Sequence, residues 1–129
     1  MYIPTLDNRI YTKPINLDIT NKCTLQCPTC PRQKSWYNRK LYNDLSIEDL
    51  KKISETFYYI EFCGFQSDPI FHPKFIDFVF MLNYNKLDIH TAASHKKKQF
   101  YEDAFSVSSE RTTWVFGLDG LPKDSHRHR

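Results

Sequence analysis

Three cysteines stand close together in the sequence, where Cys23, Cys27 and Cys30 form a C-x3-C-x2-C run. Three thiolates so close along a chain are typical of a metal site. Iron–sulfur clusters that serve only electron transfer commonly have four cysteine ligands. Three ligands leave one iron of a cubane cluster without a protein thiolate, and an open metal position admits a substrate or cofactor, as in catalytic zinc sites. The run therefore predicts a [4Fe-4S] cluster with one open iron.

Two prolines shape the same segment. Pro28 directly follows Cys27, and Pro31 directly follows Cys30. Because a residue before proline is disfavoured in helical conformation, the segment is predicted to be a loop that wraps around the metal.

Four segments, in order along the chain, resemble the radical S-adenosylmethionine (SAM) family. Residues 17–32 resemble its opening strand and cysteine loop, and residues 63–73 resemble its glycine-rich segment, commonly Gly-Gly-Glu-Pro or Gly-Asp-Pro. Residues 89–94 resemble a strand end that usually reads Thr-Asn-Gly-Ser, with Ala92-Ala93 in place of Asn-Gly. Residues 115–121 resemble a strand that reads Ser/Gly-Ile-Asp-Gly. A position that glycine occupies can require positive φ, a conformation that alanine, as at residue 93, resists.

The resemblance implies a fold, two cofactors and a reaction. Residues 1–129 would be a single truncated radical SAM core domain, the first part of a (β/α)6 barrel. A [4Fe-4S] cluster on Cys23, Cys27 and Cys30 would bind SAM at its open iron. An electron from a flavodoxin or ferredoxin would cleave SAM, and the resulting 5′-deoxyadenosyl radical would abstract hydrogen from a substrate that the sequence does not identify.

The resemblance also implies which side chains contact SAM. Ser67 and Asp68 are expected at its amino group, and Ser94 and Asp119 at its ribose or carboxylate region. Each has a simpler alternative from local chemistry. Asp68 could be a turn residue before a proline, Ser94 could cap the following helix, and Asp119 belongs to an Asp-Gly turn signal.

Strand and helix patterns alternate along the chain. Such alternation predicts an α/β fold, a partial (β/α) barrel with about four parallel strands and right-handed crossover helices. The last strand would leave an open edge that a second chain could cover. The expected strands are residues 15–20, 58–63, 87–91 and 113–118, and the expected helices are 47–57, a helix opened by Pro73, and about 97–104.

Composition bounds the class of protein. The 129 residues are 40% hydrophobic and 16% aromatic, which suits one globular domain. The net charge of +3 gives no specific signal for nucleic acid. No apolar run approaches the length of a membrane helix and no signal peptide is recognisable, so a cytoplasmic location is predicted. Clustered thiols favour metal in a reducing compartment over disulfides.

Other interpretations remain open. A structural zinc module could use the three cysteines and a histidine, and a catalytically silent fragment could act through a partner chain. Cys63 could approach the cluster, although a buried hydrophobic role is favoured. His72 and His90 are expected to be hydrogen-bonded structural residues. The basic run 95–98 could attract an anionic substrate but is more often a solvated face.

Overall fold

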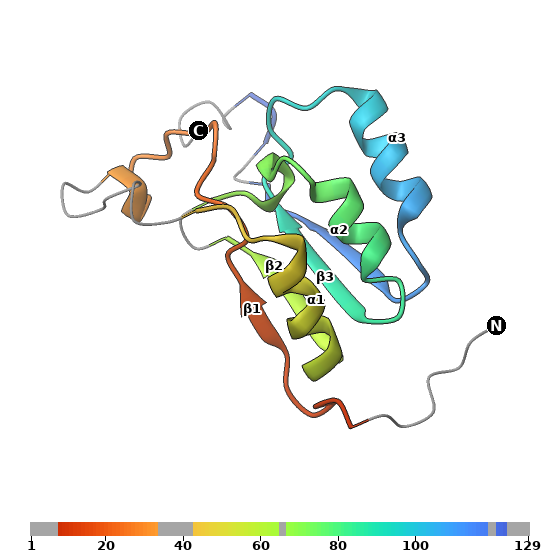
Figure 1. The fold of residues 1–129 in the computed structure, drawn as a ribbon. Coiled ribbons are helices and arrows are strands. Elements are labelled where there is room, and N and C mark those ends of the chain that lie inside the picture. The colour runs from red at the N-terminus through yellow and green to blue at the C-terminus, as the bar shows by residue number, and fades with distance from the viewer. Residues whose placement is uncertain (1–7, 34–42, 65–66, 119–120, 124–129) are drawn as a thin grey trace.

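A four-stranded, all-parallel sheet organises the protein (Figure 1). The computed structural model describes residues 8–33, 43–64, 67–118 and 121–123. The strands stand in chain order across the sheet: β1 (Ile15–Leu17), β2 (Tyr59–Cys63), β3 (Lys86–Thr91) and β4 (Thr112–Phe116). Since each parallel strand is added on the same side of the last, right-handed crossovers place the helices on one face of the sheet.

Three α-helices form that layer: α1 (Ile47–Thr56), α2 (Phe75–Met81) and α3 (Lys98–Val107) (Figure 1). Two 3-10 turns, η1 (Pro31–Gln33) and η3 (Pro69–Phe71), lie in the loops that follow β1 and β2. Ser46 begins α1, because its hydroxyl accepts a hydrogen bond from the Asp49 amide at 3.1 Å. The predicted α/β class and the order of its elements are confirmed.

Several predicted element ends were wrong. The first strand stops at Leu17 rather than residue 20, because the chain leaves the sheet there and Thr20 donates a 2.6 Å hydrogen bond to Asp44. The last strand stops at Phe116 rather than residue 118. The helix expected to open at Pro73 begins at Phe75, and α3 continues past residue 104 to Val107.

The core lies between the sheet and the helices. On β2 and β3 every second residue is fully buried and points to the helix layer, the burial pattern of a strand with one covered face. Ring centroids of Phe62 lie 6.4 Å from Phe75 and 6.5 Å from Phe78 in α2. The core residues are Ile19, Leu50, Ile60, Phe62, Ile70, Phe75, Phe78, Val79, Leu82, Leu87, Ile89 and Ala104.

The opposite face of the sheet is polar. It presents Tyr59, Glu61, Asp88 and His90, all half-buried. The Tyr59 hydroxyl donates a 2.6 Å hydrogen bond to the Asp88 carboxylate. That bond, with burial and the nearby negative charges, raises the pKa of Tyr59. In the described part of the chain this face is not covered by a helix (Figure 1).

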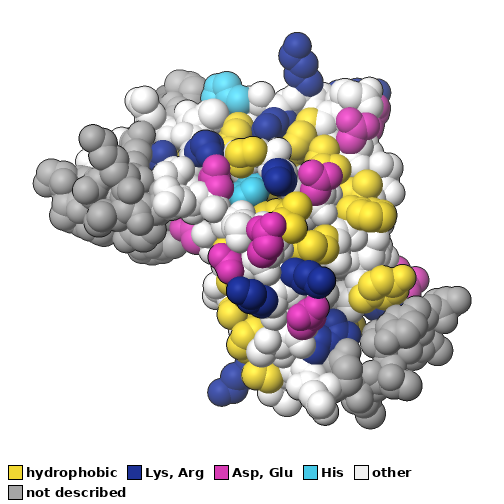
Figure 2. Space-filling view, viewed as in Figure 1, with side chains coloured by type: hydrophobic (Ala, Val, Ile, Leu, Met, Phe, Trp, Pro, Cys, Tyr) yellow, Lys and Arg dark blue, Asp and Glu magenta, His cyan; other side chains and the backbone are white. Residues whose placement is uncertain are grey.

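The helix layer carries charges of both signs, interspersed with hydrophobic side chains (Figure 2). Within the described residues, none of the helices combines the length and the apolar character needed to cross a membrane. At the sheet's end, Phe116 of β4 and the following Leu118 are 42% and 83% exposed.

Candidate functional site

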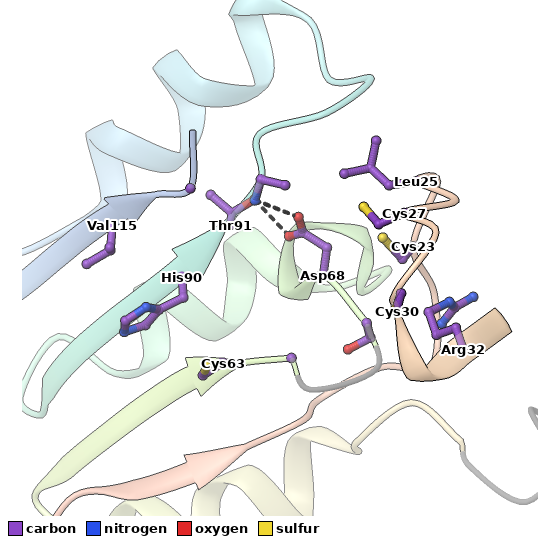
Figure 3. A pocket seen from close by; sticks show the side chains of 14 residues that line it. Cys23, Leu25, Cys27, Cys30, Arg32, Cys63, Asp68, His90, Thr91 and Val115 are labelled. Carbon is purple, nitrogen blue, oxygen red and sulfur yellow. Dashed lines mark hydrogen bonds between the residues drawn. The ribbon is translucent and has the colours of Figure 1, made fainter. Parts of the chain in front are cut away.

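A cavity of about 310 Å³ opens at the carboxyl ends of the strands (Figure 3). This end of a parallel sheet is where α/β proteins bind their ligands, because the loops that follow the strands converge there. The lining comes from all four strand ends: Cys23, Leu25, Cys27, Cys30, Arg32, Cys63, Gly64, Ser67, Asp68, His90, Thr91, Ala92, Val115 and Gly117.

The three cysteines lie on the loop that follows β1. Two turns shape it: the Cys30 amide donates to the Cys27 carbonyl at 3.0 Å, and the Gln33 amide donates to the Cys30 carbonyl at 3.0 Å. Arg32 is 7% exposed and donates a 2.6 Å hydrogen bond to the Asn21 carbonyl, which ties the two ends of the loop together. The segment is a loop, as the two prolines predict.

The thiols of Cys23, Cys27 and Cys30 are free and half-buried. Figure 3 shows the sulfur atoms of Cys23 and Cys27 directed toward the side of the cavity where Asp68 lies. Burial raises the pKa of Cys23, and the negative charge of Asp68 raises it further. A hydrogen bond with the Leu25 backbone acts in the opposite direction but does not outweigh burial. A metal that binds here must therefore displace a proton from Cys23.

Thiolates are ligands of both zinc ions and iron–sulfur clusters. Zinc requires its thiolates about 2.3 Å from one ion. Among the described residues, no group of three or more His, Cys, Asp or Glu side chains is arranged to hold one metal ion. In a cubane each thiolate binds a different iron, so three ligands need not converge on one point. The three half-buried free thiols line one cavity, and thiolates are the ligands that hold an iron–sulfur cluster.

Gly64 begins the second segment that lines the cavity, the loop after β2. A Cβ atom at this position would lie 2.0 Å from the Ser67 carbonyl oxygen, so the loop folds back onto a residue without a side chain. The Ser67 hydroxyl donates a hydrogen bond to Asp18, just beyond β1. The structure therefore places Ser67 at the cavity, with its hydroxyl engaged by the protein.

Asp68 also lies at the cavity and is 4% exposed. Its carboxylate accepts hydrogen bonds from the Thr91 hydroxyl, at 2.8 and 2.9 Å to its two oxygens, and from the Ala92 amide at 2.9 Å (Figure 3). It also accepts a 3.3 Å hydrogen bond from the Ile70 amide and so caps η3. The turn-residue alternative accounts for that cap only.

The loop after β3 has an unusual backbone. Ala93 and His95 have φ of 54° and 58°, in the left-handed region that favours glycine. Ala93 occupies the position where the family resemblance has glycine, so the chain keeps a glycine-like conformation with an alanine there. A hydrogen bond of 3.0 Å joins the Ser94 hydroxyl to that of Thr24. A second, of 2.7 Å, joins Thr24 to His95 Nδ1.

Ser94 does not cap the following helix, so that alternative was wrong. The N-cap of α3 is Lys97, without a side-chain hydrogen bond. Ser94 instead contacts the cysteine loop and does not line the cavity. Asp119 lies outside the described residues.

Of the two histidines and Cys63, only His72 has the environment that the sequence predicted. His72 is confirmed as structural, since its Nε2 donates to the Leu45 carbonyl at 2.8 Å and its Nδ1 accepts from the Lys74 amide at 3.0 Å. His90 lines the cavity, and no hydrogen bond to its ring is found among the described residues. Cys63 is exposed, so its interpretation as a buried hydrophobic residue was wrong, because β2 ends at the cavity mouth.

Sequence reasoning missed three residues that hold the site: Thr24, Arg32 and Thr91. Arg32 stands two positions after Cys30, the last cysteine of the run, where a basic side chain could have been expected to reach back to the loop. Thr91 is the last residue of the predicted strand 87–91, so its hydroxyl could have been expected to contact the loop that follows the neighbouring strand. Thr24 carries no comparable signal, because its partners lie 70 and 71 residues away.

Comparison with known proteins adds no family assignment: no family model matches the chain, and no curated protein has a significantly similar sequence.

Proposed function

We propose that this chain is a radical SAM enzyme, or part of one, with a [4Fe-4S] cluster held by Cys23, Cys27 and Cys30. One observation carries the proposal. The cysteine loop lines a single cavity together with Asp68 and Thr91, which lie in two other segments that resemble SAM-binding segments of the family. These segments are distant in sequence, and a parallel sheet brings them to the same edge.

Bound cluster and SAM would together supply a 5′-deoxyadenosyl radical for hydrogen abstraction from a substrate yet to be identified. The chain's own contribution is to place and shield them. Arg32 closes the cysteine loop through Asn21, and Leu25 and Val115 add apolar surface to the cavity. A cavity of about 310 Å³ is at the lower end of the size range of small-molecule sites.

Several further assignments belong to the proposal. The four parallel strands would form part of a (β/α) barrel, with the polar face of Tyr59, Glu61, Asp88 and His90 toward its interior. Ser67, Ser94 and Asp119 would lie near SAM. The reductant would be a flavodoxin or ferredoxin, and the protein would work in the cytoplasm, where thiols stay reduced.

Anaerobic reconstitution with iron and sulfide tests the proposal. We expect close to four irons and four sulfides per chain, and an electron paramagnetic resonance signal in the reduced protein that changes when SAM is added. Each single Cys→Ser change in the C-x3-C-x2-C run should abolish cluster retention. Cys63→Ser is the matched control, because Cys63 lines the same cavity outside the run, and it should retain the cluster. Zinc without iron would overturn the proposal.

A second candidate function is binding of a partner chain at β4. The observation that favours it is the exposure of Phe116 in β4, an edge strand of the described sheet, and of Leu118 just after it. A reconstituted cluster that is indifferent to SAM, with no release of 5′-deoxyadenosine under reducing conditions, would favour this candidate.

A further inference from the structure

The carboxylate of Asp68 is surrounded by donors from the protein itself. The Thr91 hydroxyl and the Ala92 amide come from the end of β3, and the Ile70 amide comes from η3. All three donors lie within hydrogen-bonding distance of a side chain that is 4% exposed. An incoming ammonium group would have to share this buried carboxylate with three donors that are already in place.

The backbone of Asp68 makes a third connection. Its amide donates a 3.0 Å hydrogen bond to the carbonyl of Lys22, the residue that precedes Cys23. Asp68 therefore joins three segments: the start of the cysteine loop, the loop after β2 and the end of β3. The hydrogen bonds of Thr24 with Ser94 and His95 join the first and third of these segments a second time.

We infer that Asp68 is a positioning residue, which fixes the cysteine loop against the end of β3, rather than the side chain that binds the amino group of SAM. The inference about the loop stands on the contacts above, whereas the statement about SAM rests on the proposed function. The two parts are therefore tested separately, the first on protein without a cluster.

Comparison of Thr91→Val with Asp68→Asn separates the two roles. Valine has nearly the shape of threonine, so the change leaves the aspartate charge in place and removes a hydroxyl that donates to Asp68 and accepts from the Ala93 amide at 3.0 Å. If Asp68 positions the loop, Thr91→Val and Asp68→Asn both lower the urea midpoint of unfolding. If Asp68 serves only as a SAM ligand, Asp68→Asn leaves that midpoint unchanged, and Thr91→Val loses only what its bond with the Ala93 amide contributes. Asp77→Asn, on an exposed carboxylate of α2, controls for loss of one charge.

Alkylation of the cysteines reports the position of the loop directly. In cluster-free protein, we expect Thr91→Val to speed maleimide modification of Cys23 about fivefold, the factor that corresponds to one lost hydrogen bond of ordinary strength. Cys63, already exposed, should react at the wild-type rate and serves as the internal control. Asp68→Asn also removes a charge close to Cys23, so Thr91→Val is the decisive variant. Wild-type rates and midpoints in Thr91→Val would overturn the inference.

The affinity for SAM tests the second part of the inference, that Asp68 does not bind the amino group. On reconstituted protein with equal iron content, Asp68→Asn should keep its affinity for SAM within about threefold of wild type. A loss of tenfold or more, with normal cluster-free stability and alkylation, would instead assign Asp68 to the amino group. Failure of any variant to hold a cluster leaves the alkylation result intact, so a failed proposal of function is distinguishable from a failed inference.

Discussion

Replacement of Gly64 by alanine should disturb the loop after β2 far more than the same change at Gly117. Both glycines line the cavity and follow a strand. A Cβ on Gly64 would lie 2.0 Å from the carbonyl oxygen and 2.5 Å from the carbonyl carbon of Ser67, whereas a Cβ on Gly117 would meet its nearest atom, the Thr91 carbonyl oxygen, at 3.9 Å. Only the first substitution therefore requires backbone to move.

The expected size of the effect follows from that distance. Ordinary non-bonded contacts lie at about 3.5 Å, so the Ser67 backbone must retreat by roughly 1.5 Å. Forced shifts of this kind cost about 1–3 kcal/mol. Replacing glycine by alanine also restricts the unfolded chain, which stabilises by about 0.4–1 kcal/mol where the native backbone permits it. Because this term is common to both variants, the difference between them isolates the close approach.

Urea unfolding of the reduced, cluster-free protein, followed by circular dichroism, measures that difference. We expect Gly64→Ala to be less stable than Gly117→Ala by about 1–3 kcal/mol, with Gly117→Ala equal to or slightly above wild type. Since Asp68 follows Ser67, the displaced loop should also speed alkylation of Cys23. Equal stability of the two variants would refute the argument that Ser67 packs directly against Gly64.

Two further predictions concern the cysteine loop. Arg32→Met should lower the free energy of unfolding by about 1–3 kcal/mol, because the Asn21 carbonyl loses a buried charged donor. After reconstitution, the same variant should lose iron to a chelator faster than wild type. Arg32→Lys should recover part of the stability and part of the iron retention. Burial acts to raise the pKa of Asp44, but hydrogen bonds from Lys22 and Thr20 outweigh it and hold that pKa below its ordinary value. The wild type should therefore be more stable than Asp44→Asn at neutral pH, and a pH series of urea midpoints should show this advantage disappearing as pH falls through the lowered pKa of the folded state.

Much of the fold was predictable because its signals are local. The apolar spacing of residues 47–57 and the N-cap signal of Ser46 place α1 within one residue of its observed end. The strands were predictable from alternating or continuous apolar residues. Their order in the sheet follows from helical crossovers that join successive parallel strands. Element ends were less predictable, since the end of β1 depends on where Thr20 finds Asp44. That partner lies 24 residues away and is not indicated by any local pattern.

Several of the residues that line the cavity were predictable from the sequence, and the hydrogen bonds that hold them were not. Spacing identified Cys23, Cys27 and Cys30, and the sheet topology put their loop beside the ends of β2 and β3. The direction of the Asp68 side chain could not be read from the sequence, because a carboxylate before proline suits a turn, a ligand contact or a buried hydrogen-bond acceptor equally well. The choice depends on Thr91, which comes from another strand.

The placement of the cysteines is therefore a property of the sheet more than of their own loop. In the described part of that loop, two turns and the bond from Arg32 to the Asn21 carbonyl join one loop residue to another. Its position relative to the sheet comes from bonds to the loops that follow other strands: Lys22 to the loop after β2, and Thr24 to the loop after β3. Because these anchors sit on different strands, loss of one leaves the other in place. Disordering the whole loop should then require loss of both, so substitutions at the two anchors should not act additively on alkylation of Cys23.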